Sequence, residues 1–196
     1  MIIKDKTKLQ EKCLPVSIKE GEEIATKLLH ELRQSEDGIG LAANQIGINK
    51  RVCVVNVNNP IVLINPEIIE QSEEKFVFPE GCLSFPDSKV RTTRNVSIKV
   101  KSDNHKEVLS FNAESKDIND AFECVCVQHE IDHLNGITMF DREFKQVPIK
   151  REGKKIGRNE KVTITDGDET KVMKYKKAQL LIESGAWKIS DVHINV

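Results

Sequence analysis

The segment His129-Glu130-Ile131-Asp132-His133 constrains this chain more than any other feature of its sequence. Residues four positions apart on a helix lie one turn apart on the same face, so His129 and His133 present two imidazoles to one metal ion. Glu130 then stands next to a ligand, where its carboxylate takes a proton from a water that the ion polarises. The motif predicts a helix that carries a metal site and a base. Two surface histidines are the alternative that this segment alone leaves open.

Two earlier segments fit the same site. Residues 80–84 read Glu-Gly-Cys-Leu-Ser, and Cys82 offers a thiolate, a soft ligand that suits zinc or ferrous iron. Residues 38–45 are mostly small and end with the side-chain amide of Gln45. With two imidazoles, the thiolate makes three protein ligands and leaves a fourth position for water, the pattern of catalytic rather than structural metal sites.

Taken in order, the three segments resemble the signature motifs of the peptide deformylases. The matching stretches are Gly-Ile-Gly-Leu-Ala-Ala-x-Gln at 38–45, Glu-Gly-Cys-Leu-Ser at 80–84 and Gln-His-Glu-x-Asp-His-Leu-x-Gly at 128–136. The resemblance covers roughly residues 8–144. It implies an enzyme that removes the formyl group from N-formylmethionyl nascent peptides and releases formate.

The resemblance also implies a role for each motif residue. Cys82, His129 and His133 hold the metal, which lowers the pKa of its water from about 16 to near 7. Metal-bound hydroxide then attacks the formyl carbon, with Glu130 as general base and later as general acid. The Gln45 amide and the Leu83 backbone N–H stabilise the oxyanion. The family implies Fe²⁺ in most members and Zn²⁺ in some, while the ligand types themselves also suit Ni²⁺ or Co²⁺.

The same resemblance implies a substrate site. Backbone around Gly40 pairs with the peptide groups of the substrate, and an apolar pocket takes the methionine side chain. The positions that match this pocket are Ile39, Phe78, Phe122, Val125 and Cys126. Ordinary core packing explains each of these five equally well. Cys126, three residues before His129, is also an alternative third ligand, and a small buried core cysteine is its plainer role.

Two charged residues are expected to support the site. The family pattern suggests that Asp132 faces away from the metal and pairs with an arginine, for which Arg94 is the candidate. A solvent-exposed aspartate is the alternative. Glu80 resembles a carboxylate that holds the loop around Cys82.

Hydrophobic periodicity predicts an α+β fold. Residues 18–34 show helical spacing with Ser17 as N-cap, and residues 51–57, 61–64 and 96–100 are β-branched or alternating runs typical of strands. Residues 121–136 form a buried helix that Asn135-Gly136 ends. We therefore expect antiparallel strands packed around a central helix that carries the two histidines.

The C-terminal part departs from the family. We expect a catalytic domain over residues 1–144 and a basic extension over 145–196, with a hairpin at 161–173 and a short helix at 175–189. Residues 145–161 contain seven Lys or Arg and two acidic residues. We expect this segment to dock on the ribosome through RNA phosphates, although a solvated basic face is the alternative.

Composition restricts the protein class without identifying it. The chain has 196 residues, of which 38% are hydrophobic and 31% charged, which suits one sizeable core. No stretch is long and apolar enough to span a membrane, and the N-terminus lacks a signal-peptide core. Five irregularly spaced cysteines favour a reducing compartment. We therefore expect a cytoplasmic monomer without membrane contacts.

Two other classes share part of the pattern. A zinc endopeptidase also uses His-Glu-x-x-His, with a third ligand downstream for which Glu152 is the candidate. The other class is a non-catalytic metal-binding or ribosome-associated protein. The replacement of Glu130 or Gln45 would favour this class, but both residues are present.

Overall fold

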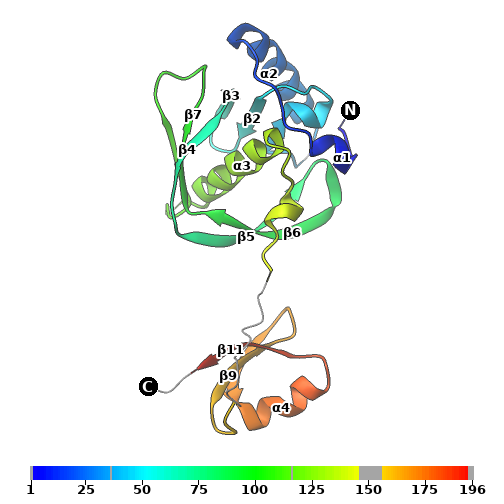
Figure 1. Cartoon of the computed structure of the whole chain (residues 1–196), viewed down its shortest axis with the longest axis vertical. Coiled ribbons are helices and arrows are strands. Elements are labelled where there is room, and N and C mark those ends of the chain that lie inside the picture. Colours follow the sequence, from blue (N-terminus) through cyan, green and yellow to red (C-terminus); the bar gives the residue numbers. More distant parts are fainter. Residues whose placement is uncertain (1, 36, 116, 146–155, 194–196) are drawn as a thin grey trace. The chain divides into compact units, whose positions relative to one another are not determined.

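The computed structural model describes residues 2–35, 37–115, 117–145 and 156–193 (Figure 1). The chain divides into two compact units, residues 1–144 and residues 145–196, which are described separately. None of the described helices is sufficiently long and apolar to cross a membrane.

The first unit is an α+β assembly of antiparallel sheets around the helix α3, Ile118–Leu134 (Figure 1). One sheet has the order β1-β2-β3, a second has the order β4-β7-β8, and β5 and β6 form a two-stranded sheet. The strands are β1 Gly40–Ala42, β2 Val52–Asn56, β3 Pro60–Ile64, β4 Glu67–Gln71, β5 Lys75–Cys82, β6 Phe85–Asn95, β7 Ser97–Lys101 and β8 Leu109–Asn112. The short elements are α1 Lys6–Leu9 and the 3₁₀ turns η1 Ala43–Ile46 and η2 Met139–Arg142. This arrangement confirms the predicted fold class.

Helix α2, Ile18–Arg33, forms where the periodicity predicts it. Ser17 caps it, since its Oγ accepts the N–H of Glu20 at 3.3 Å. Its apolar stripe, Ile24, Leu28 and Leu32, is buried. These apolar side chains are removed from water because α2 packs on one face of the β1-β2-β3 sheet.

Strand β2 is apolar at almost every position because both of its faces are buried. Val52 and Val54 pack toward α2, whereas Cys53 and Val55 belong to the core around α3. Successive side chains of a strand point to opposite faces, so a strand covered on both faces is a continuous apolar run. The sheet therefore lies between the two helices and fixes β1 beside α3.

Helix α3 is the buried centre of the first unit. It begins three residues earlier than expected, at Ile118, because the side chain of Asp117 accepts the N–H of Asn119 and caps it. It ends at Leu134 with Asn135 as its C-cap, and Gly136 follows with φ 73°. From Cys124 to Leu134 every residue is buried, which no amphipathic surface helix would show.

The β5–β6 hairpin was not predicted from the sequence. Its residues lack a clean alternation, yet they pair from Lys75↔Asn95 to Gly81↔Lys89, and a register shift follows before Cys82↔Phe85. The hairpin brings Cys82 to α3, where its Sγ lies 3.3 Å from His133 Nε2.

The second unit is a small α+β module of antiparallel strands and one helix. Strands β9 Lys161–Thr165 and β10 Thr170–Lys174 form the expected hairpin, with Gly167 at φ 111°. The expected helix at 175–189 is wrong in its last part: α4 spans only Tyr175–Glu183, and β11, Lys188–His193, pairs with the free edge of β9. Gly185 at φ 77° ends the helix, and the sheet takes the β-capable residues that follow.

Candidate metal centre and active site

Three side chains that the sequence analysis named as ligands converge in the structure. Helix α3 supplies His129 and His133 from one face, and the end of β5 supplies Cys82. The Cys82 Sγ lies 3.3 Å from His133 Nε2, and the two Nε2 atoms lie 3.1 Å apart. All three donor atoms fall within 4.8 Å of one another, and no other such group of three metal-binding side chains occurs among the described residues.

These distances fit a divalent metal ion. Metal–nitrogen bonds of about 2.0–2.1 Å and a metal–sulfur bond of about 2.3 Å at tetrahedral angles separate the ligand atoms by about 3.3–3.6 Å. The observed separations of 3.1 and 3.3 Å are close to those values. The site is therefore shaped for one ion with a thiolate and two imidazoles.

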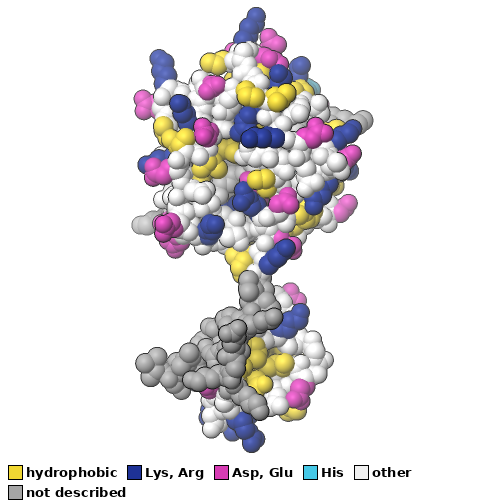
Figure 2. Space-filling model, viewed as in Figure 1, with side chains coloured by type: hydrophobic (Ala, Val, Ile, Leu, Met, Phe, Trp, Pro, Cys, Tyr) yellow, Lys and Arg dark blue, Asp and Glu magenta, His cyan; other side chains and the backbone are white. Residues whose placement is uncertain are grey.

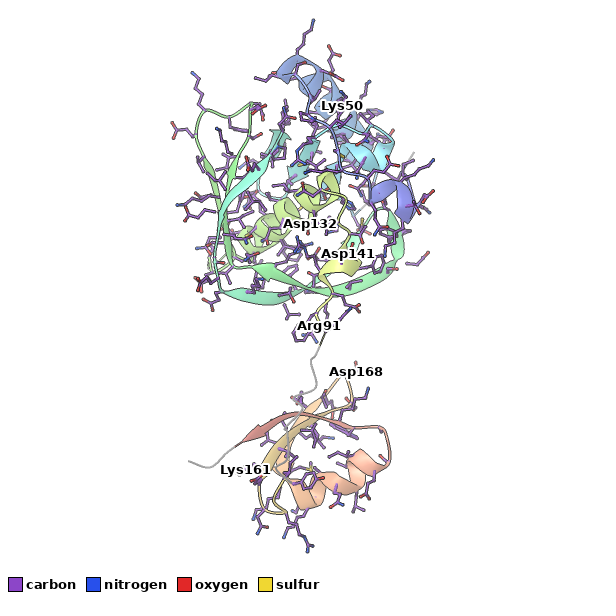
Figure 3. All side chains as sticks on the ribbon, in the orientation of Figure 1. Lys50, Arg91, Asp132, Asp141, Lys161 and Asp168 are labelled. Atoms are coloured by element: carbon purple, nitrogen blue, oxygen red, sulfur yellow. The ribbon has the colours of Figure 1, made fainter. Side chains whose placement is uncertain are left out.

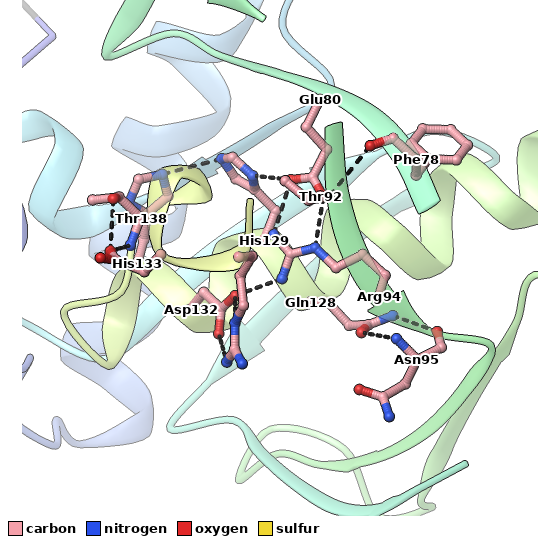
Figure 4. Close-up of polar contacts among 12 residues, drawn as sticks. Phe78, Glu80, Thr92, Arg94, Asn95, Gln128, His129, Asp132, His133 and Thr138 are labelled. Carbon is pink, nitrogen blue, oxygen red and sulfur yellow. Dashed lines mark hydrogen bonds and ion pairs between the residues drawn. The ribbon is translucent and has the colours of Figure 1, made fainter. Parts of the chain in front are cut away.

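Glu80 fixes the orientation of the first imidazole (Figure 4). Its Oε2 accepts a hydrogen bond from His129 Nδ1 at 2.7 Å, which leaves Nε2 to face the other donors. Arg94 binds the same carboxylate through Nε at 2.6 Å and Nη2 at 2.9 Å, and Thr92 donates to it as well. Burial alone would raise the pKa of Glu80, but the hydrogen bonds from Arg94 and His129 outweigh it and lower that pKa to about 2.

Glu130 lies next to the donors without joining them. It is buried, and its Oε2 has no hydrogen-bond partner among the described residues. Burial raises the pKa of Glu130 to about 7, while the neighbouring His129 acts in the opposite direction. A carboxyl group with a free oxygen and a pKa near neutrality is suited to accept and return a proton.

Gln45 and Leu83 border the same space. The Gln45 Oε1 accepts the N–H of Ala42 at 2.8 Å, and this bond turns its Nε2 toward Cys82 Sγ at 3.5 Å and Ser84 Oγ at 3.2 Å. Leu83 follows Cys82 in the tight turn between β5 and β6. The two donor groups named from the sequence therefore both adjoin Cys82 and line the same cavity.

A cavity of about 330 Å³ opens beside these groups. The expected substrate-binding residues all line it: Ile39, Gly40, Phe78, Phe122, Val125 and Cys126. Phe78 and Phe122 meet edge to face, with ring centroids 5.1 Å apart. Ile39 and Phe122 are each 40% exposed, so they form the open rim of an apolar pocket rather than part of the core.

Cys126, the alternative thiolate ligand, is less favourably placed than Cys82. Cys126 is buried, its Sγ lies 3.6 Å from the Ile39 carbonyl, and it does not belong to the group of convergent donors. Burial raises the pKa of its thiol well above the usual value. Glu152, the third ligand that an endopeptidase would need, lies outside the described residues.

The structure confirms the expected pairing of Asp132 and adds a residue that the sequence analysis missed. Arg94 Nη1 lies 2.5 Å from Asp132 Oδ2. Arg142, from η2, binds both oxygens of the same carboxylate. An arginine ten residues after an aspartate carries no local sequence signal, so only the fold reveals this contact.

Comparison with known proteins agrees with this site. Residues 1–149 match the family model described as polypeptide deformylase. A peptide deformylase of Natranaerobius thermophilus is 44% identical over 124 residues, covering 62% of this chain and 75% of that protein. One of Prochlorococcus marinus (strain AS9601) is 39% identical over 153 residues, covering 74% of each chain.

Solved structures give the same result. The class I type b peptide deformylase of Acinetobacter baumannii superposes with a TM-score of 0.63 at 33% identity, covering 72% of this chain and 97% of that one. A probable peptide deformylase of synechococcus phage S-SSM7 superposes with a TM-score of 0.61 at 36% identity, covering 72% and 98%. The chain thus belongs to the peptide deformylase family, metal-dependent hydrolases that remove the N-terminal formyl group from nascent polypeptides.

Proposed function

We propose that this protein hydrolyses the formyl group of N-formylmethionyl peptides at the centre formed by Cys82, His129 and His133, with Glu130 as general base and acid. The observation that carries the proposal is the convergence of the three donors beside a buried carboxyl group that has a free oxygen. When bound there, a divalent metal polarises a water molecule and lowers its pKa toward about 7.

Glu130 moves the proton. Its Oε2 accepts a proton from the attacking water and afterwards delivers it to the departing amine. Such a proton transfer contributes about 10²–10⁴ to a rate. The buried position of Glu130 supports this role, because burial raises the pKa of its carboxyl group and so favours its holding a proton.

Gln45 and Leu83 stabilise the charge that develops on the formyl oxygen. The Gln45 Nε2 is held in place by the bond between its own Oε1 and the Ala42 N–H. Loss of one oxyanion donor costs about 3 kcal/mol, or 10²–10³ in rate. The Leu83 N–H is proposed as the second donor.

The substrate peptide binds along β1. This strand is an edge of its sheet, since among the described strands only β2 pairs with it. An edge strand adds an extended peptide through main-chain hydrogen bonds, so Gly40 is the proposed backbone partner. The methionine side chain then enters the apolar cavity lined by Ile39, Phe78, Phe122 and Val125.

The proposed ion is Fe²⁺, with Zn²⁺, Ni²⁺ or Co²⁺ as possible substitutes, because a thiolate with two imidazoles suits all four. The proposed active protein is a monomer, since residues 1–144 supply every group named above. Its proposed location is the cytoplasm, where formylated chains leave the ribosome. Metal analysis after anaerobic purification tests the identity of the ion.

Ribosome docking is the proposed role of the second unit. The predicted basic segment, 145–161, lies largely outside the described residues. Its described end joins a basic cluster, because Lys161 faces Lys174 across the β9–β10 pair and the N–H of Lys176 binds the Arg158 carbonyl at 3.0 Å. Lys177 follows on α4.

The charge distribution supports a phosphate-rich partner. Lys161 and Asp168 lie at opposite ends of the β9–β10 hairpin (Figure 3), so the basic cluster is separated from the acidic turn. On the face drawn in Figure 2, basic and acidic side chains of the first unit are intermixed. The basic cluster is therefore the proposed site of contact with RNA phosphates.

One experiment tests the main proposal. The purified protein is given a formyl-methionyl tripeptide and the acetyl-methionyl equivalent, and products are identified by mass spectrometry. We expect formate and a free α-amine from the first peptide and no reaction of the second. Cleavage of a peptide bond would favour the endopeptidase, and metal binding without turnover would favour a non-catalytic protein.

A further inference from the structure

We infer that Arg142 is a positioning residue that holds the metal-facing imidazole of His129 through a chain of buried charged groups. The inference rests on the metal site proposed above. It concerns a residue outside the three motifs, in the 3₁₀ turn η2.

Each step of this chain is a charged hydrogen bond, and the steps from Asp132 to His129 can be followed in Figure 4. Arg142 binds Asp132 through two nitrogens, Nη2 to Oδ1 at 2.7 Å and Nε to Oδ2 at 3.0 Å. Asp132 binds Arg94, Arg94 binds Glu80 through two nitrogens, and Glu80 accepts from His129 Nδ1. Four contacts thus connect η2 to a proposed ligand.

The charges explain why Arg142 is needed. Asp132, Arg94 and Glu80 are 6%, 3% and 6% exposed, so their charges are removed from water. Without Arg142, this group contains two carboxylates and one guanidinium. Arg94 is then the guanidinium that compensates the charges of both Asp132 and Glu80. The side chain of Arg142 is itself 44% exposed, whereas that of Asp132 is 9% exposed, so removing Arg142 leaves part of the charge of a buried carboxylate uncompensated. Arg94 is then drawn toward Asp132, and its hold on Glu80 and thereby on His129 weakens.

The turn that carries Arg142 is itself fixed. Asp141 Oδ2 accepts both the N–H and the hydroxyl of Thr138 at 2.8 Å, and Met139 is buried. The N–H of Phe144 binds the Arg91 carbonyl at 2.7 Å. Backbone anchors on both sides of Arg142 hold its guanidinium against Asp132, whereas an arginine on a free loop would not be held.

The test is a double-mutant cycle. Arg142→Gln, Asp132→Asn and the double variant are compared with Arg33→Gln, which changes an exposed arginine at the end of α2. Two quantities are measured: kcat and KM on a formyl-methionyl peptide, and the rate at which a chelator removes the metal. Mutation of a residue that hydrogen-bonds to a metal ligand typically lowers metal affinity or activity by 10–100-fold. For the more distant Arg142 we expect about 3–10-fold lower kcat, unchanged KM and about 3–10-fold faster metal loss.

The double variant separates a positioning role from a merely structural one. If Arg142 acts through Asp132, adding Arg142→Gln to Asp132→Asn has no further effect on metal loss. Arg142→Lys, which keeps the charge and loses the two-point contact, is expected to fall between wild type and Arg142→Gln. If Arg142→Gln fails to fold, Arg142→Lys is used for the same two measurements.

Other results would overturn the inference. An Arg142→Gln protein that matches Arg33→Gln in both measurements, slower metal loss, or additive effects in the double variant would each refute the positioning role. A wild-type protein that bound no metal would instead refute the proposed metal centre itself, so the two failures are distinguishable.

Discussion

Gly40 lies against Glu130 so closely that a Cβ at residue 40 would stand 2.5 Å from Glu130 Oε1. The same Cβ would stand 2.5 Å from Cys126 Sγ. The glycine is thus required by packing, because φ at this position is not in the left-handed region. The proposed peptide-binding strand and the proposed general base are fitted to each other at this contact.

The first prediction follows from this contact. Gly40→Ala should displace the Glu130 carboxylate and lower turnover by about 10² or more, since general-base catalysis depends on hydrogen-bond reach. The bound metal should stay, because Glu130 is not a proposed ligand. Metal content and kcat are measured together. Gly157→Ala, where a Cβ meets only ordinary contacts from 3.5 Å outward, is the control. Normal turnover of Gly40→Ala would contradict the assigned position of the base.

The second prediction concerns Glu130 directly. Glu130→Ala should retain the metal and lose about 10²–10⁴ in turnover, because the residue moves protons without binding the ion. Stoichiometry by elemental analysis and kcat on a formylated peptide test both parts. A variant that is purified without metal, or one as active as wild type, would show that the role is assigned wrongly.

The third prediction separates the two cysteines of the site. Cys82→Ser should strongly deplete the metal, because a neutral hydroxyl is a poor substitute for a thiolate ligand. Cys126→Ser should leave the metal content unchanged and reduce only stability, since Cys126 packs in the core around α3. Metal content and thermal midpoint are measured for each variant. Equal metal loss in both would rule out Cys82 as the unique thiolate ligand.

The fourth prediction concerns the second unit. A chain ending at Lys145 keeps the contact between Phe144 and Arg91 and should deformylate a short peptide normally. It should lose the salt-sensitive part of its co-sedimentation with ribosomes, because phosphate contacts release counterions. Peptide turnover and sedimentation at several salt concentrations test this.

Charge reversal supplies the matched control for the truncation. Lys174→Glu and Lys177→Glu in the full chain should weaken ribosome binding in the same direction, whereas Lys99→Glu on β7 should not. Undiminished binding of the truncated chain would show that the second unit is not the docking site. Loss of peptide turnover would show that it belongs to the catalytic fold.

Local sequence determined much of this protein. The periodicity of residues 18–34 and the cap at Ser17 were sufficient to predict α2. Both signals are local, because the apolar stripe and the capping hydroxyl depend on residues that are close in sequence. The spacing of His129 and His133 was likewise sufficient to put both imidazoles on one face of α3. The three motifs, in their order along the chain, were sufficient to predict the family.

Only the tertiary structure decided what depends on distant residues. Cys82 meets His133 across 51 positions because β5 and β6 pair with a register shift that no local pattern announces. Arg142 reaches Asp132 because η2 folds back onto α3, and residues 188–193 become a strand because β9 offers them an open edge. Helix periodicity is a property of neighbouring residues, whereas strand pairing and buried charge networks are chosen among many distant partners by burial and hydrogen bonding in the complete fold.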